Sequence, residues 1–197
     1  MDCEKKRLRS FYSTARRALS LEERESFNQA ICSYVKELEV YKNAFCVAGF
    51  IPHGAEPDIR PLLVNKRSFL PRYNEAIGVY EMVEIANLEQ DLVLGHYGIP
   101  EPRKELKAAE PEIVKNELLF LVPALSCDRT GRRLGRGGGF YDRMLEGAKL
   151  PPIGIIYSCQ FAENLPFEDH DLPVSYVVTE LGATKCESFF LKTVRKS

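Results

Sequence analysis

The sequence predicts an α/β fold, with a mostly parallel sheet that helices cover on both faces. Short, continuous apolar runs recur along the 197-residue chain, and amphipathic segments and loops separate them. Continuously apolar strands are typical of parallel sheets, because both faces of such sheets are buried under helices. We expect one domain over residues 1–197, with N-terminal helices in residues 3–40 and the α/β core in residues 44–180.

Two helices are expected before the first strand. The apolar residues of the first helix recur at three- and four-residue steps, and they are Leu8, Phe11, Tyr12, Ala15 and Leu19. Residues Ser20 to Glu23 have the form of a capping box, so a second helix should begin there. The apolar stripe of this second helix contains Phe27, Ile31, Tyr34, Val35 and Leu38.

The remaining elements are predicted from apolar runs and from the turn residues that bound them. Strands are expected at residues 44–51, 68–71, 77–83, 117–122, 153–157 and 176–179. Pro52 and Pro123 mark the ends of the first and fourth of these strands, because proline cannot donate to a strand ladder. One or two helical turns are expected at residues 59–64 and a helix at residues 140–146, whereas residues 87–103 should be rich in loops.

The composition argues against several classes of protein. The chain has 27 basic and 28 acidic side chains, a net charge of −1 and 45% apolar residues. A general nucleic-acid-binding protein needs an excess of Lys and Arg. No apolar run approaches the ~20 residues of a membrane span, and residues 1–20 do not resemble a signal peptide. We therefore expect a cytoplasmic protein that binds neither nucleic acid nor membranes.

The cysteines and histidines give no sign of a disulfide framework or a zinc site. The six cysteines are scattered without a C-x-x-C pair, which favours reduced thiols. The three histidines (His53, His96 and His170) lack metal-ligand spacing to one another and to the cysteines.

Residues 131–143 are the most informative stretch and read GRRLGRGGGFYDR. Glycines let a backbone turn with positive φ and bring its N–H groups close to a ligand, and a turn leading into a helix favours an anion. Arginine adds forked donors that suit phosphate oxygens. The stretch predicts a phosphate-binding loop, with a flexible basic turn and an RGG-like nucleic-acid contact as the alternatives. It matches neither the Walker motif nor G-x-G-x-x-G.

Acidic residues on loops and a basic helix face are further candidates. Glu56 and Asp58 follow the first predicted strand, where a carboxylate can accept hydrogen bonds from a heterocycle or act as a base. Asp142 and Asp171 are of the type that binds Mg²⁺ together with phosphate oxygens. The first helix carries a basic cluster of Lys5, Lys6, Arg7 and Arg9. Each of these groups has a simpler interpretation as solvated surface, but the loops after the strands should meet at one cleft.

The order of the motifs carries a resemblance over nearly the whole chain. The matching segments are KKRLR (5–9), PHGAEPD (52–58), PRY (71–73), IPEP (99–102), VPAL with the glycine stretch (122–143), and the closing pattern of Gln160, Leu165-Pro166 and His170-Asp171. Together they resemble the 5-formyltetrahydrofolate cyclo-ligase family, also called 5,10-methenyltetrahydrofolate synthetases. Phe140 departs from the family pattern, which often has tyrosine there, and this removes one possible hydroxyl contact.

The resemblance implies a fold and an activity. The fold is a three-layer α/β sheet of the type shared with sugar-phosphate isomerases and CoA transferases. The activity is the ATP- and Mg²⁺-dependent conversion of 5-formyltetrahydrofolate to 5,10-methenyltetrahydrofolate, with release of ADP and phosphate, by a monomer whose partners are small molecules. The alternatives are a non-catalytic relative that binds nucleotide, folate or RNA, and a sugar-phosphate isomerase, which the basic helix and the glycine loop disfavour.

The resemblance also implies roles for individual residues. Arg136 and Glu56 would be catalytic, with Arg136 nearest the transferred phosphoryl group and Glu56 on the folate. Folate contacts would come from Ile51, Glu56 and Phe140. Mg²⁺ would be bound by Asp142 and Asp171. ATP would be bound by Lys5, Arg9, Arg133, Leu134, Gly135, Arg136, Gly137, Gly138, Gly139, Phe140 and Tyr141.

Overall fold

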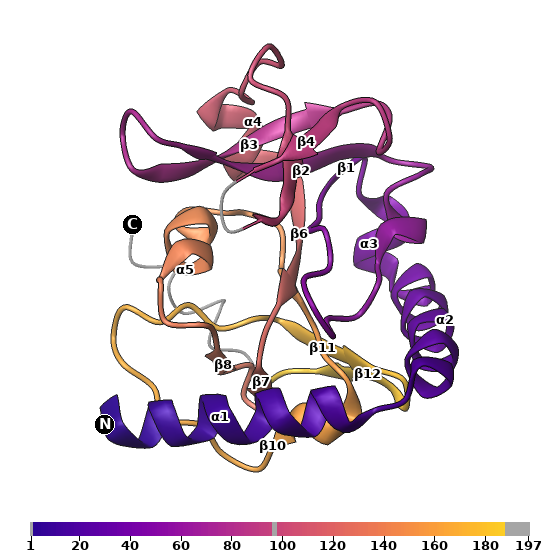
Figure 1. Cartoon of the computed structure of the whole chain (residues 1–197), viewed down its shortest axis with the longest axis vertical. Helices are drawn as coiled ribbons and strands as arrows, with labels where there is room; N and C mark the ends of the chain where they lie inside the picture. The colour runs from indigo at the N-terminus through magenta and orange to yellow at the C-terminus, as the bar shows by residue number, and fades with distance from the viewer. Residues whose placement is uncertain (1, 96–97, 188–197) are drawn as a thin grey trace.

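A seven-stranded sheet forms the centre of the computed structural model, which describes residues 2–95 and 98–187 (Figure 1). The strand order is β12-β11-β9-β6-β1-β2-β3. The bounds are β1 Cys46–Ala48, β2 Arg67–Asn74, β3 Val79–Ile85, β6 Leu118–Pro123, β9 Ile153–Ile155, β11 Tyr176–Thr179 and β12 Gly182–Lys185. The four inner pairings are parallel, and only the edge pairings β2–β3 and β11–β12 are antiparallel. The predicted mostly parallel sheet is confirmed.

Helices cover both faces of this sheet and make three layers. On one face lie α2 (Leu21–Glu37), α3 (Glu39–Asn43) and the 3₁₀ turn η1 (Arg60–Leu62), whose buried Ile31, Val35 and Tyr41 pack against strand residues such as Leu119. On the other face lie α4 (Pro111–Asn116) and α5 (Phe140–Leu145), which pack against Phe120. Burial of both faces explains why β6 is apolar along its length, since its first five residues are all buried.

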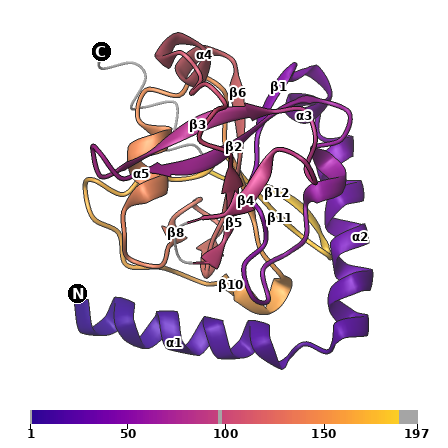
Figure 2. The same cartoon turned by 45° about the horizontal axis from the view of Figure 1, so that its top comes forward.

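The first helix, α1 (Asp2–Ala18), lies apart from these layers and crosses one end of the sheet (Figures 1 and 2). Tyr12 packs there with Leu134, Ala162 and Leu165, and Leu8 covers the edge of this small core. The helix is therefore fixed beside the segments that follow the strands at their carboxyl ends. This placement brings the basic face of α1 toward the glycine loop.

The two predicted N-terminal helices are confirmed, and so is the cap between them. The N–H of Glu23 donates to Ser20 Oγ at 3.1 Å, and the N–H of Ser20 donates to Glu23 Oε2 at 2.7 Å. A third helix, the short α3, also precedes the first strand. It is separate from α2 because α2 ends at Glu37 and Leu38 is its C-cap. The predicted helix at residues 140–146 is confirmed as α5, and the turn predicted at residues 59–64 is η1.

Several short elements correct the prediction. The strand predicted at residues 44–51 is only Cys46–Ala48, and the segment predicted to be loop-rich contains the hairpin of β4 (Leu92–Leu94) and β5 (Pro100–Pro102). The glycine stretch contains β8 (Arg133–Leu134), which pairs with β7 (Ser126–Asp128), and β10 (Phe161–Ala162) completes that small sheet. Strands this short carry no readable periodicity, because two or three residues do not define a repeat. His96 lies outside the described residues.

The structure also bears on disulfide bonds and on membrane-spanning helices. All six cysteines lie among the described residues as free thiols. No helix in the described part of the chain has both the length and the apolar character needed to cross a membrane.

Candidate active site

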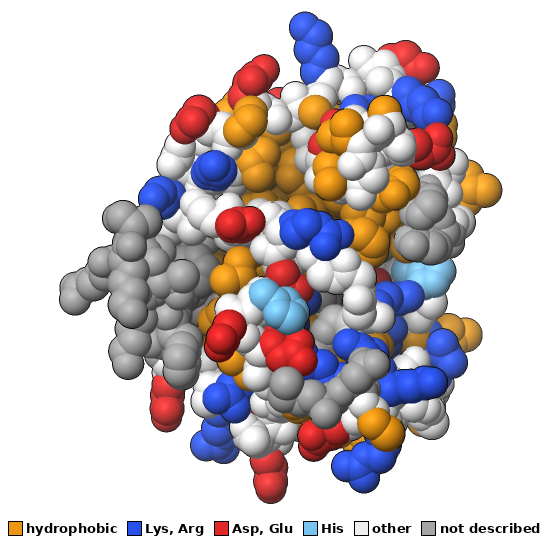
Figure 3. All heavy atoms as spheres, turned by 90° about the vertical axis from the view of Figure 1, so that its left-hand side faces the viewer, with side chains coloured by type: hydrophobic (Ala, Val, Ile, Leu, Met, Phe, Trp, Pro, Cys, Tyr) orange, Lys and Arg blue, Asp and Glu red, His pale blue; other side chains and the backbone are white. Residues whose placement is uncertain are grey.

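A cavity of about 800 Å³ lies where the loops after β1 and β6 meet the glycine loop, α1 and the β4–β5 hairpin. Every residue that the sequence singled out for ATP, folate or Mg²⁺ lines this cavity. The face in Figure 3 shows apolar surface in a hollow, with acidic, basic and histidine side chains around it. The expectation that the Glu56 loop and the glycine loop share one cleft is confirmed, whereas the roles of the individual residues stay predictions.

The glycine loop reaches the cavity through a backbone that side chains would disturb. Gly137 has φ +102°, and a Cβ there would come within 3.4 Å of the Arg9 guanidinium. Gly139 has φ +62° and caps the N-terminus of α5 in the left-handed conformation. Because L residues rarely adopt such conformations, glycine at both positions lets the loop pass close to α1 and turn into α5.

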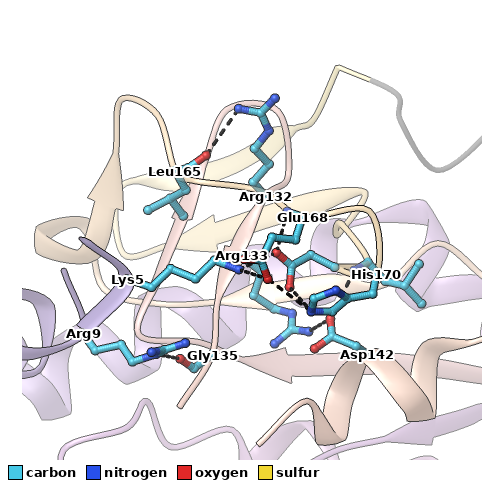
Figure 4. Close-up of polar contacts among 11 residues, drawn as sticks. Lys5, Arg9, Arg132, Arg133, Gly135, Asp142, Leu165, Glu168 and His170 are labelled. Carbon is cyan, nitrogen blue, oxygen red and sulfur yellow. Dashed lines mark hydrogen bonds and ion pairs between the residues drawn. The ribbon is translucent and has the colours of Figure 1, made fainter. Parts of the chain in front are cut away.

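Two basic side chains of α1 contact the residues at this end of the cavity (Figure 4). Lys5 Nζ lies 2.9 Å from Asp171 Oδ2 and 3.1 Å from Glu168 Oε2, and Arg9 Nε donates to the Gly135 carbonyl at 3.0 Å. Burial alone would lower the pKa of Lys5, but its bonds to the two carboxylates outweigh burial and raise that pKa. Lys5 is therefore a fixed positive charge on the wall of the cavity.

The two predicted magnesium ligands have different neighbours. Asp142 Oδ1 accepts from Arg133 Nη2 at 2.6 Å and from the Leu172 N–H, while Asp171 lies beside Lys5. Candidate ligand atoms of Asp171, Glu168 and His170 lie within 4.8 Å of one another, and Asp142 is not in this group. The structure thus gives Asp171 two additional neighbours that could serve as ligands.

The donor set nevertheless fits a hard cation such as Mg²⁺. Asp142 Oδ2 and Asp171 Oδ1 accept no hydrogen bond from the described residues, so one oxygen of each carboxylate stays available. Mg²⁺ prefers carboxylate oxygens together with phosphate oxygens and water, and both carboxylates line the cavity beside the basic loop. Lys5 and Arg133 already neutralise part of the negative charge here.

A second group of charges joins the glycine loop to the Glu56 loop. Arg136 Nη2 lies 2.7 Å from Glu56 Oε1, and the His53 N–H donates to Glu56 Oε2 at 3.0 Å. Arg16 Nη1 lies 3.8 Å from the same Oε1, and the Arg16 side chain is only 4% exposed. Burial lowers the pKa of Arg16, and the Glu56 charge partly offsets this effect. The Glu56 carboxylate therefore lies between two arginines.

The other end of the cavity is mainly apolar. Ile51, Leu70, Ile99 and Pro100 line it together with Phe140. The Phe140 ring contacts the Tyr80 ring edge-on, with centroids 4.8 Å apart. This surface is better suited to a flat ring system than to a phosphate chain, so the cavity has a basic end and an apolar end.

Sequence reasoning missed some residues of this site. Arg16 was not proposed, although Lys5, Arg9 and Arg16 follow at helical spacing and share one face of α1. Glu101, Glu168 and Tyr80 line the cavity, whereas Arg16 contacts the site through Glu56. Glu101 belongs to the IPEP segment, to which the family resemblance gives no role.

The fold and the cavity define an α/β enzyme whose site has a basic, glycine-rich end and an apolar end. Residues 2–180 match the model of the 5-formyltetrahydrofolate cyclo-ligase family, and the chain belongs to that family. Its predicted enzyme class and fold are thereby confirmed.

Relatives of this family cover most of the chain. The 5-formyltetrahydrofolate cyclo-ligase of Escherichia coli K12 is 31% identical over 172 residues, which are 83% of this chain and 93% of the relative. The Mycolicibacterium smegmatis cyclo-ligase is 30% identical, and the match covers 89% of this chain and 93% of the relative. The solved structure of Aquifex aeolicus 5,10-methenyltetrahydrofolate synthetase is 32% identical, with a TM-score of 0.81 over 93% of both chains. These relatives favour the enzyme over the non-catalytic alternative.

Proposed function

We propose that this cavity converts 5-formyltetrahydrofolate to 5,10-methenyltetrahydrofolate, with ATP as co-substrate and ADP and phosphate as the other products. The observation that carries the proposal is that one cavity holds the basic glycine loop, the Glu56 carboxylate and an apolar end. Membership of the cyclo-ligase family supports the same reaction.

The chemistry explains why ATP is needed. The oxygen of the N5-formyl group is a poor leaving group, so N10 cannot displace it directly. Transfer of the γ-phosphoryl group to that oxygen forms an activated iminium phosphate. N10 then attacks the formyl carbon and loses its proton, the carbon–oxygen bond breaks, and phosphate leaves. The protein must hold the two substrates in line and balance the charge of the phosphoryl group in transfer.

The basic end of the cavity supplies these charges. Lys5, Arg9 and Arg133 would bind the phosphates, and the backbone of residues 133–141 would enclose the nucleotide. Arg133 is held by Asp142 and Lys5 by Asp171, so both cations are positioned before a ligand arrives. Preorganised charges cost little reorganisation at the moment of reaction. Asp142 and Asp171 would hold Mg²⁺, which when bound neutralises phosphate charge.

Arg136 and Glu56 would act at the junction of the two ends. Arg136 is 52% exposed although it is paired, so its guanidinium can move from Glu56 to the transferring phosphoryl group. When Arg136 moves away, Glu56 still accepts the hydrogen bond from the His53 N–H and still lies beside the charge of Arg16. Its free oxygen can then accept an N–H of the folate, next to Ile51 and Phe140.

A coupled assay tests the proposal. Purified protein is mixed with 5-formyltetrahydrofolate, and the absorbance of the methenyl product is followed with and without ATP and Mg²⁺. We expect product only with both, and one ADP released for each methenyl group formed. Absence of any ATP-dependent product would contradict the proposal.

We also propose that the enzyme acts as a monomer in the cytoplasm on small molecules alone. The net charge of −1 does not favour a polynucleotide. Light scattering during size-exclusion chromatography measures the oligomeric state, and a dimer mass would contradict the proposed monomer. Filter binding of RNA at low salt tests whether the enzyme acts on small molecules alone.

A further inference from the structure

A buried carboxylate in the cavity has no role in the scheme above. Glu101 lies on β5, is 6% exposed and lines the cavity. Its Oε2 accepts the backbone N–H of Tyr73 at 3.0 Å, where β2 extends beyond its pairing with β1. Its Oε1 is also buried and has no hydrogen-bond partner among the described residues.

This oxygen is distinct from the other carboxylates of the cavity. Glu56, Asp142, Glu168 and Asp171 each lie beside a lysine or an arginine, whereas Glu101 takes part in none of the described ion pairs. A buried acceptor that is left unpaired is costly, and native structures keep few of them. A donor that arrives with a ligand would remove this cost.

The surroundings favour one kind of ligand. The neighbouring wall is apolar, with Leu70, Pro71, Ile99 and Pro100, so a hydrogen bond made there is little weakened by water. A phosphate chain would be repelled by a carboxylate. The pyrimidine part of a reduced pterin is flat, and the pterin carries several N–H donors and no phosphate, so it complements both the apolar wall and the carboxylate.

The backbone at Gly95 also packs closely against the Glu101 side chain. A Cβ at Gly95 would lie 2.6 Å from both Cγ and Cδ of Glu101, so any larger residue at position 95 would push the carboxylate from its place. The Tyr73 N–H and Gly95 therefore fix the direction in which Oε1 is presented.

We propose that Glu101 is a second substrate-binding carboxylate, which accepts an N–H hydrogen bond from the reduced pterin ring of 5-formyltetrahydrofolate. The inference rests on the proposed function and adds a folate contact to that of Glu56. Both oxygens of Glu101 then have donors, one from Tyr73 and one from the substrate.

The substitution Glu101→Gln tests this role sharply. A carboxylate accepts two N–H groups, whereas an amide has one accepting oxygen and one donating NH₂ group. The amide side chain of this variant can therefore satisfy the Tyr73 N–H or the pterin, but not both. Loss of a hydrogen bond to a charged group should weaken binding about ten- to a hundredfold. We expect the Kd and KM for 5-formyltetrahydrofolate to rise by that factor, with the KM for ATP and the melting temperature unchanged.

Two further variants complete the experiment. Gly95→Ala should raise the same folate constants by displacing the Glu101 carboxylate, while Glu105→Gln, at an exposed position outside the cavity, should leave them unchanged. Unchanged folate constants in Glu101→Gln, or a joint loss of stability and ATP affinity, would show a purely structural role and overturn the inference. Calorimetric binding of 5-formyltetrahydrofolate needs no turnover, so an inactive wild-type protein would contradict the proposed function without deciding the role of Glu101.

Discussion

Arg136 on the glycine loop and Glu56 on the loop after β1 form an ion pair of 2.7 Å although 80 residues separate them in the chain. Both residues line the cavity, so the pair joins the two loops within it. Glu56 is 9% exposed and held by the His53 N–H, whereas Arg136 is half-exposed. The carboxylate is thus the fixed partner and the guanidinium the movable one. In the proposed mechanism a phosphoryl group would compete with Glu56 for Arg136, which would connect nucleotide binding to the availability of the Glu56 carboxylate for folate.

The first prediction concerns Arg136→Ala. Removing this charge should lower kcat about 10²- to 10³-fold, as the loss of one electrostatic donor to a transition state does. Substrate KM values should change less, because Lys5, Arg9 and Arg133, the proposed phosphate contacts, are unchanged in this variant. Steady-state rates of methenyl formation give the measurement, with Arg129→Ala at an exposed position as the control. A rate within twofold of wild type would remove Arg136 from the mechanism.

Glu56→Gln should impair the use of folate without impairing the binding of nucleotide. We expect the KM for 5-formyltetrahydrofolate to rise on the order of tenfold or more, because a charged hydrogen-bond acceptor is lost. Nucleotide binding should persist, since neutralising Glu56 leaves Arg136 free to meet phosphate. Isothermal calorimetry with a non-hydrolysable ATP analogue measures this directly. Loss of nucleotide binding in this variant would show that the division of the cavity is wrong.

Local patterns predicted much of this fold. The capping box at Ser20 and Glu23 and the apolar run of β6 each have a cause within a few neighbouring residues. Local patterns do not predict the β4–β5 hairpin or the small β7–β8–β10 sheet. Their strands have two or three residues and depend on partners elsewhere in the chain. Proline disfavours a strand, yet Pro100 and Pro102 lie in β5, which in the described part of the chain pairs with β4 alone.

The candidate site was predictable as a set of residues, but its pairings were not. The order of the motifs identified the glycine loop, the basic helix and Glu56 without any geometry. That Glu56 pairs with Arg136, and Asp171 with Lys5, depends on how three separate loops converge. Glu101 illustrates the same limit, because its free oxygen follows from a tertiary contact with the Tyr73 N–H.

Asp142→Asn should weaken the use of Mg²⁺. We expect the Mg²⁺ concentration for half-maximal rate to rise on the order of ten- to a hundredfold, the range seen when groups that support a metal are changed. The KM for 5-formyltetrahydrofolate should stay constant, because Asp142 lies at the basic end. Rates across a Mg²⁺ titration provide the measurement, and Glu146→Gln, exposed just after α5, is the control. An unchanged titration would exclude Asp142 as a ligand.

The Lys5–Asp171 pair should make stability depend on acid pH. Burial tends to raise the pKa of Asp171, but the hydrogen bonds from Lys5 and from the Glu168 N–H outweigh it and lower that pKa below its ordinary value of 3.8. The pKa of Lys5 is raised above 10.5. A lowered carboxylate pKa stabilises the fold above the unfolded-state value, and this contribution is lost as the pH falls through the folded-state value. The raised lysine pKa gives a contribution that disappears only above pH 10.5.

Asp171→Asn should therefore be less stable than wild type near neutral pH, by about 1 kcal/mol for a pair that is partly exposed. The difference should be constant around neutral pH and should shrink as the pH falls below about 3.8, because Asp171 is protonated first in the unfolded wild type and, at still lower pH, in the folded wild type. Urea unfolding curves at a series of pH values measure it. Asp169→Asn is the control, because Asp169 is exposed and takes part in none of the described ion pairs. A difference that stayed the same well below pH 3.8 would show that Asp171 stabilises the fold through shape rather than through its charge.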